Sequence, residues 1–216
     1  MKKVMKITFI GVGNVGAPLA DHLQKLEHSV TIAARNPNSP SVQAALSRNA
    51  SFKVEPPLEA VKSAEVVFLA TPFTANEAAL SEVSSALEGK ILVDCTNPVG
   101  ANLTHGLKSE RSGAEVVQSF VPAARVVKAF TIYGFENFED NIYPGYGDLK
   151  PAMLIAGNDG IAKQTVSTLC QELGWEPVDV GNLAMSLHLE HMTLLWIQMA
   201  RVQGLGSGFV WAKLQK

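Results

Sequence analysis

Over about the first 130 residues of this chain, short apolar runs alternate with amphipathic stretches. The apolar, β-branched runs typical of buried strands lie at residues 4–10, 30–34, 52–54, 65–70, 91–94 and 125–130. Stretches with helical spacing lie between them, at residues 14–26, 42–46, 58–62, 75–87 and 112–121. Strands that alternate with helices predict an α/β fold, a doubly wound and mainly parallel sheet with right-handed crossovers.

The pattern changes after residue 130, where residues 131–150 have no clear period. Strands at residues 153–156 and 177–180 flank an amphipathic helix at 161–173, and Gly174 ends this helix as a C-terminal cap. A long helix at residues 184–199 is apolar nearly all round, so it must be covered on more than one face. We therefore expect one domain over residues 1–130 and a small C-terminal α/β portion over residues 131–216, which caps it and forms a homodimer interface.

Composition narrows the class of protein. Hydrophobic residues make up 47% of the 216 residues and charged residues 18%, which suits a globular domain with a real core. A net charge of -2 argues against a nucleic-acid partner. Cys95 and Cys170 are too few and too far apart for a disulfide framework, which favours a reducing, cytoplasmic setting.

Two features of the sequence bear on a membrane or secretory function. No apolar stretch reaches the ~20 residues that cross a bilayer, so we expect no membrane partner. Residues 1–20 begin with a basic segment and continue in a largely apolar run, as a secretory signal does. We reject a signal because cleavage there would remove the glycine-rich segment described next.

Residues 11–16 (GVGNVG) fit the pattern G-x-G-x-x-G, directly after a predicted strand and at the start of a predicted helix. Gly11 permits the tight turn, Gly13 lets a pyrophosphate approach the backbone, and Gly16 lets the helix pack close to the sheet. The N–H groups and dipole of the first helical turn favour the negative phosphates. We therefore expect a Rossmann-type dinucleotide-binding domain whose pyrophosphate site consists of Gly11, Gly13, Asn14, Val15 and Gly16. A glycine-rich turn in another α/β fold is the alternative.

The end of the second predicted strand indicates which dinucleotide is bound. NAD-binding domains have an Asp or Glu there, which accepts hydrogen bonds from the ribose 2′-hydroxyl. This chain has Arg35 and Asn36 instead. A guanidinium group can hold a 2′-phosphate through two hydrogen bonds, whereas a carboxylate would repel it. The prediction is NADP(H), with Arg35 and Asn36 at the 2′-phosphate, and an exposed loop arginine is the alternative.

Two further strand ends lie where a ligand is expected, because ligands of open parallel sheets lie beyond the carboxyl ends of the strands. Each combines a Thr with a Pro, at residues 70–73 (ATPF) and 94–98 (DCTNP). We expect these segments to flank the ribose and nicotinamide through Thr71, Pro72, Phe73, Asn97 and Pro98. Ordinary strand-to-helix turns are the alternative, and Cys95 fits inert packing better than a reactive thiol.

Together these segments resemble a known family. In order, residues 11–16, 34–36 (ARN), 70–72, 94–98 and 126–130 (VVKAF) are similar to the deazaflavin-dependent NADP oxidoreductases, whose archetypes reduce NADP with coenzyme F420. Residues 174–181 and the helix containing 194–196 (LLW) are also similar, so the resemblance covers nearly the whole chain. The cytoplasmic reductase domain of the STEAP metalloreductases is similar too.

The resemblance implies direct hydride transfer between the nicotinamide and a deazaflavin or flavin ring stacked against it. The protein would then supply binding and orientation, and no catalytic residue is assigned. We expect the small-molecule acceptor near Thr131 and Tyr133, under the C-terminal helix, although Tyr133 could instead cap the core. Archaeal deazaflavin enzymes have a His where this chain has Thr131, so a flavin, a quinone or another small acceptor stays open.

Two other functions are alternatives. A non-catalytic module that senses NADPH would bind the cofactor without turnover. A carbonyl or imine reductase of the hydroxyacid dehydrogenase type would need a proton donor, from Lys128 or a C-terminal histidine. Lys128 lies inside a predicted strand, which favours a structural or interface role. His188 and His191 could share one helix face, but they lack a third ligand, so no metal site is expected.

Overall fold

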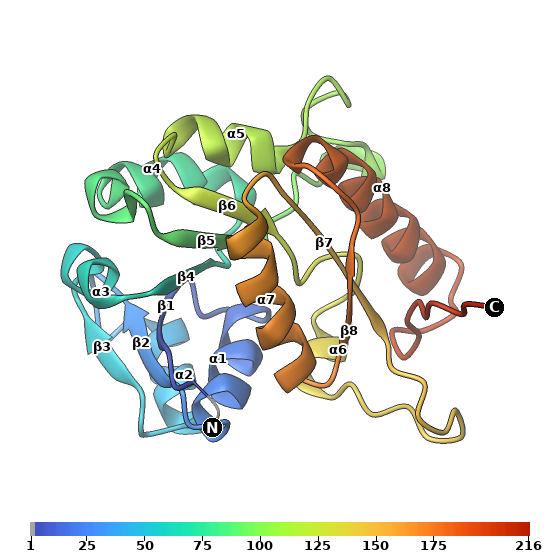
Figure 1. Ribbon diagram of the computed structural model, residues 1–216, viewed down its shortest axis with the longest axis horizontal. Coiled ribbons are helices and arrows are strands. Elements are labelled where there is room, and N and C mark those ends of the chain that lie inside the picture. Colours follow the sequence, from blue (N-terminus) through green and yellow to red (C-terminus); the bar gives the residue numbers. More distant parts are fainter. Residues whose placement is uncertain (1–2) are drawn as a thin grey trace.

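The computed structural model describes residues 3–216, an eight-stranded sheet with helices against both faces (Figure 1). Its strands are β1 (Lys6–Ile10), β2 (Ser29–Ala33), β3 (Lys53–Glu55), β4 (Val66–Leu69), β5 (Ile91–Asp94), β6 (Arg125–Lys128), β7 (Ala152–Gly157) and β8 (Glu176–Asp179). Their order across the sheet is β3-β2-β1-β4-β5-β6-β7-β8. The first six strands are parallel, in the order of dinucleotide-binding folds, and β7 runs antiparallel to β6. The predicted doubly wound α/β fold is confirmed.

The helices are α1 (Gly16–Lys25), α2 (Pro40–Arg48), α3 (Pro57–Ser63), α4 (Asn76–Ser81), α5 (Gly113–Phe120), α6 (Glu136–Glu139), α7 (Gly160–Glu172) and α8 (Ser186–Ile197). The helix predicted over residues 75–87 is divided into α4 and two 3-10 turns, Phe73–Ala75 and Ser84–Leu87. At the end of α4, the Ser81 side chain competes for a backbone carbonyl of the helix itself. The Ser81 hydroxyl donates to the Ala78 carbonyl, and the Ser84 hydroxyl donates to the Phe120 carbonyl.

Each central strand buries side chains on both faces of the sheet. In β4, Val66 and Phe68 join the core beneath α1, α2 and α7, whereas Val67 and Leu69 join the core beneath α3, α4 and α5. Such alternation follows from the two-residue repeat of a strand, and parallel sheets are covered by helices on both faces. The continuous apolar runs in the sequence are therefore strands buried on both sides.

The C-terminal portion extends the same sheet. β7 pairs with β6, β8 pairs with β7, and α7 packs on β7 and β8. The prediction that Gly174 caps α7 agrees with the backbone. Gly174 has φ +87°, and the Gly174 and Trp175 N–H groups donate to the carbonyls of Gln171 and Cys170. Helix α8 contacts α5 and β7 and continues as a π-helical turn, Gln198–Val202.

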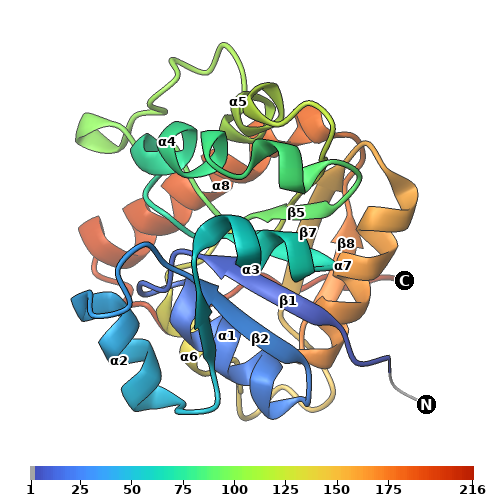
Figure 2. The ribbon, with the colours of Figure 1, turned by 90° about the vertical axis from the view of Figure 1, so that its left-hand side faces the viewer.

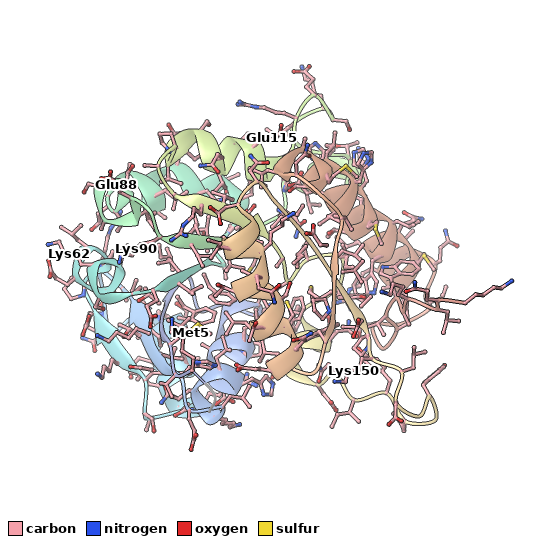
Figure 3. All side chains as sticks on the ribbon, in the orientation of Figure 1. Met5, Lys62, Glu88, Lys90, Glu115 and Lys150 are labelled. Carbon is pink, nitrogen blue, oxygen red and sulfur yellow. The ribbon has the colours of Figure 1, made fainter. Side chains whose placement is uncertain are left out.

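Charged side chains such as Lys62, Glu88 and Lys150 lie at the outer edge of the molecule (Figure 3). Across the described residues 3–216, no helix combines the length and apolar character needed to cross a bilayer. Met1 and Lys2, part of the signal-like N-terminal segment, lie outside the described residues.

A buried carboxylate joins α1 to the end of α2, beside the glycine loop. Asp21 is 2% exposed, and its oxygens accept hydrogen bonds from Lys25, Arg48 and Asn49 at 2.9, 3.1 and 2.9 Å. Burial alone would raise the pKa of Asp21, but these hydrogen bonds outweigh it and hold the pKa below its usual value. Ionised Asp21 therefore stabilises the fold above about pH 4, and this stabilisation is lost as the pH falls through the lowered pKa.

We predict that Asp21→Asn lowers the free energy of unfolding by about 1–3 kcal/mol at pH 7, because charged hydrogen bonds are lost. The difference from wild type should shrink as the pH falls below about 4 and through the lowered pKa, at which the folded wild-type carboxyl also becomes protonated. Urea unfolding at several pH values measures both, with the exposed Glu88→Gln as control. A difference that stays constant with pH would contradict the role given to the charge.

Candidate active site

The carboxyl ends of four strands meet at one edge of the sheet. Ile10 of β1 pairs with Leu69 of β4, Leu69 with Asp94 of β5, and Asp94 with Lys128 of β6. Because these strands are parallel, the turns that follow them share one edge, toward which the β1 and β2 arrows point in Figure 2. This is the edge where open α/β sheets bind ligands.

The glycine loop fits closely against the turn after β4. Gly11 has φ +94°, and a Cβ there would lie 2.7 Å from the Ala70 carbonyl carbon. A Cβ on Gly16 would lie 2.1 Å from the Gly11 carbonyl oxygen. A Cβ on Gly13, by contrast, would meet nothing within 4 Å, so the middle of the loop faces open space. Within the described chain, the first turn of α1 has no side-chain cap and no acidic residue, so the loop fits a pyrophosphate.

A hollow of about 330 Å³ lies beside this loop, between the end of β2 and α4. It brings together Gly11, Arg35, Asn36 and Thr71 from the predicted site. The remaining lining residues are Ile10, Val12, Ala33, Ala34, Ser39, Ser41, Val42, Pro57, Ala75, Ala78, Ala79 and Glu82. An adjoining hollow of about 300 Å³ contains the predicted Gly13 and Asn14, and Val12 and Ser41 line both hollows.

Arg35 is engaged with a carboxylate in this hollow. Its Nη2 lies 2.6 Å from Glu82 Oε2, and its Nε donates to the same oxygen at 2.7 Å. Nη2 also donates to the Ala78 carbonyl at 3.3 Å. Neither partner was found from the sequence, because both lie more than 40 residues further along the chain.

The other predicted cofactor residues lie outside the two hollows. Phe73 and Pro98 lie together at the start of α5, where a Cβ on Gly113 would be 2.9 Å from the Phe73 ring and 3.0 Å from the Pro98 ring. Pro72 is exposed, Val15 is half-buried, and Gly16 is buried under the loop.

Asn97 is held by two threonine hydroxyls. Its Oδ1 accepts hydrogen bonds from Thr131 at 2.7 Å and from Thr193 at 3.1 Å. Thr193, on α8, also accepts a hydrogen bond from the Ile132 N–H at 3.0 Å. Both threonines are buried and Asn97 is half-buried. Thr193 was missed by the sequence reasoning, and it joins α8 to the predicted acceptor side.

Tyr133 lies in the core. It is 5% exposed, its ring stacks on Trp175 with 5.3 Å between centroids, and its hydroxyl donates to the Ala152 carbonyl at 2.6 Å. Of the two roles left open by the sequence, contact with an acceptor and capping of the core, the structure shows core packing. Phe130 and Ile132 have φ of +51° and +68°, so the chain turns sharply after β6 and carries Tyr133 inward.

A buried ionic cluster lies behind the site. Lys128 is fully buried, and its Nζ lies 3.0 Å from Asp94 Oδ2 and 3.1 Å from Glu190 Oε1. It also donates to the Thr96 carbonyl. Burial alone would lower the pKa of Lys128, but the two carboxylates raise it above its ordinary value. Lys128 therefore stays charged and has a structural role, as its position in a strand indicated.

Glu190 links this cluster to α5 and to a loop histidine. Its carboxylate accepts hydrogen bonds from the N–H groups of Gly113 and Ala114, at 2.9 and 3.3 Å. His105 Nε2 lies 2.8 Å from Glu190 Oε2. His105 Nδ1 accepts hydrogen bonds from the backbone N–H groups of residues 107 and 109, so this nitrogen carries no proton. The proton is therefore on Nε2, which donates to Glu190.

The cluster also reaches the turn after β4. Asp94 Oδ1 accepts from the Thr96 hydroxyl at 2.7 Å, and Thr96 accepts from the Asn76 amide at 2.9 Å. The Thr71 hydroxyl donates to Asn76 Oδ1 at 2.8 Å. A continuous hydrogen-bond path thus joins Thr71, a predicted cofactor residue, to Glu190 on α8. The signal in the sequence was a single charged residue within an apolar strand or helix, which indicates burial but names no partner.

Cys95 is a buried thiol, and His191 is hydrogen-bonded to a serine. Burial raises the pKa of the Cys95 thiol well above its ordinary value, which fits the inert role expected for it. His191 Nε2 contacts the Ser109 hydroxyl at 3.0 Å. Over the part of the chain that the structure describes, no three His, Cys, Asp or Glu residues are placed to hold a metal ion.

Comparison with known proteins agrees with this geometry. The family described as NADP oxidoreductase, coenzyme F420-dependent, matches residues 6–98, which include the glycine loop, Arg35, Thr71 and Asn97. Over these residues, this chain is similar to the F420-dependent NADP oxidoreductase family. The resemblance inferred from the sequence is confirmed.

Similar proteins extend the likeness beyond residue 98. Metalloreductase STEAP3 of Rattus norvegicus is 32% identical over 89% of this chain, but over only 37% of its own length. The F420-dependent NADP reductase of Methanocaldococcus jannaschii is 31% identical over 64% of this chain and 63% of its own. A crystal structure from Arthrobacter sp. FB24, provisionally assigned as an F420-dependent NADP reductase, has a TM-score of 0.87 and 29% identity. It covers 98% of this chain and 100% of its own. The chain thus spans about one third to two thirds of the curated relatives described here.

We predict that Lys128→Met lowers the free energy of unfolding by about 3–5 kcal/mol, because it leaves the Asp94 and Glu190 carboxylates buried without their cation. Urea unfolding at pH 7 measures the loss. The exposed Lys62→Met is the control and should change stability by less than about 1 kcal/mol. Equal losses in the two variants would show that the buried cluster does not stabilise the fold.

Proposed function

We propose that this chain binds NADP(H) and transfers a hydride between its nicotinamide and a deazaflavin coenzyme of the F420 class. The observation that carries the proposal is the open cradle at Gly13, next to a hollow that contains Arg35 at the end of β2. The match to that family over residues 6–98 supports the cofactor and the class of acceptor. An assembly as a homodimer and a cytoplasmic setting remain predictions.

The proposal gives each part of the site a binding role. The backbone of the glycine loop holds the pyrophosphate, and Arg35 and Asn36 hold the 2′-phosphate. The turns that follow β4 and β5 flank the ribose and nicotinamide through Thr71, Pro72, Phe73, Asn97 and Pro98. The C-terminal portion roofs this cleft, and the acceptor lies on the side of Thr131.

NADPH, when bound, supplies the hydride from its nicotinamide ring. The chain's own contribution is orientation. Asn97 is fixed by Thr131 and Thr193, so its amide N–H groups remain available to hold a ring or carboxamide in one position. Such positioning is the main catalytic need when a hydride passes directly between two stacked rings.

The carbonyl or imine reductase alternative is disfavoured in the version in which Lys128 donates the proton. That reaction needs a proton donor beside the nicotinamide. Lys128 is fully buried, its ammonium is held between Asp94 and Glu190, and its pKa is raised. The NADPH-sensing alternative differs from the proposal in one measurable property, because a sensing module would bind NADPH without turnover.

Anaerobic loss of NADPH absorbance, with coenzyme F420 and FMN offered in turn, tests the acceptor. We expect rapid turnover with F420. Turnover with FMN alone would replace the deazaflavin with a flavin. Tight NADPH binding without turnover on either ring would favour the sensing or carbonyl-type function, and absence of NADPH binding would overturn the proposal.

We predict that Arg35→Gln raises the Kd for NADPH by about 10- to 100-fold and the Kd for NADH by less than about threefold, because only NADPH has the 2′-phosphate. Gln is preferred to Glu, because a new carboxylate would lie beside Glu82. Titration of protein fluorescence measures both constants. The exposed Arg111→Gln is the matched control. Equal losses for the two cofactors would remove Arg35 from the 2′-phosphate site.

A further inference from the structure

The charges of the residues that line the hollow at the end of β2 sum to zero. Among the described lining residues, Arg35 and Glu82 are the charged ones, and they form an ion pair. A 2′-phosphate carries about -1.5 to -2 charges at neutral pH, and its attraction to a free guanidinium is reduced when a carboxylate already neutralises that group. The electrostatic preference for NADP(H) is therefore weaker than Arg35 alone implies.

Glu82 and Arg35 approach the hollow from different elements. Arg35 follows β2, whereas Glu82 and Ala78 belong to the segment around α4, which lies across the carboxyl edge from α2 in Figure 2. The guanidinium reaches across and contacts both Glu82 and the Ala78 carbonyl. The neighbouring Val83 is fully buried, which anchors the Glu82 backbone beside the hollow that its side chain lines.

The pair is exchangeable. The side chains of Arg35 and Glu82 are 66% and 35% exposed, and ion pairs this exposed are weak. An arriving phosphate can therefore take the guanidinium from Glu82, but it must then lie close to the released carboxylate. NADH has a 2′-hydroxyl in place of the phosphate, so it meets no such repulsion. A carboxylate can also accept a hydrogen bond from that hydroxyl.

We propose that Glu82 is a specificity-determining residue, which competes with the 2′-phosphate for Arg35 and thereby narrows the preference for NADP(H) over NAD(H). This inference rests on the proposed function, because it assigns the hollow to the adenosine end of the dinucleotide. In NAD-binding domains an Asp or Glu at the end of the second strand favours NAD(H). Under this proposal, Glu82 supplies such a carboxylate from the segment around α4, because the end of β2 lacks one.

The test compares Glu82→Gln with wild type by fluorescence titration of NADPH and NADH. The Gln side chain keeps the shape of Glu and removes its charge. We expect the Kd for NADPH to fall by roughly five- to tenfold, since like charges at close range are strongly unfavourable. The Kd for NADH should not fall. Glu77→Gln, on the exposed face of α4 and outside the hollow, is the matched control and should leave both constants unchanged.

Measuring the Kd for NADPH at two ionic strengths distinguishes an electrostatic effect of Glu82 from an effect of the substitution on the shape of the hollow. The gain in NADPH affinity should shrink at about 0.5 M salt, because mobile ions screen exposed charges. An unchanged Kd for NADPH, or an equal change for both cofactors, would overturn the role of Glu82, while NADPH binding by wild type would leave the proposed cofactor standing. If wild type binds neither cofactor, the proposed function fails, and the role of Glu82 fails with it.

Discussion

A fully buried lysine ammonium group is the constraint on which the carboxyl edge of this sheet depends. Lys128 is fully buried at the end of β6, and an isolated charge there would be very unfavourable. Asp94 supplies one counter-charge from the neighbouring strand, and Glu190 supplies the other from α8, more than 60 residues away. Helix α8 cannot move from this edge without leaving Lys128 short of a partner. Thr193 lies three residues after Glu190, on the same helical face, so the contact that fixes Asn97 depends on the same anchor.

Local signals were enough to predict the fold and the dinucleotide side of the site. Buried parallel strands appear in the sequence as β-branched apolar runs. The glycine loop is contiguous in sequence, so residues 11–16 are enough to indicate a dinucleotide site. Two elements are shorter than expected. The helix expected over residues 75–87 is regular only over α4, near whose end the Ser81 hydroxyl bonds to the Ala78 carbonyl, and β6 ends at Lys128, shortly before Phe130 and Ile132 adopt positive φ.

Contacts between distant residues could not be predicted in the same way. Arg35 looks like a free cation in the sequence, and its neutralisation by Glu82 depends on how α4 packs beside β2. Tyr133 has the residue type expected of a ligand-stacking ring, yet the turn after β6 directs it onto Trp175. The position of Lys128 inside a predicted strand favoured a structural or interface role, but only the three-dimensional arrangement of β5, β6 and α8 identifies Asp94 and Glu190 as its partners.

The two ends of the proposed cleft are held by opposite kinds of interaction. At the adenosine end, Arg35 and Glu82 are exposed, and an exposed ion pair exchanges partners at little cost. At the nicotinamide end, Asn97 is fixed by buried hydroxyls, behind which lies a satisfied network of buried charges. Hydride transfer depends steeply on the distance and alignment of two rings, whereas cofactor choice depends on a phosphate far from the chemistry. A rigid nicotinamide end and an adjustable adenosine end allow substitutions near Arg35 to alter cofactor preference without disturbing the geometry in which the hydride would move.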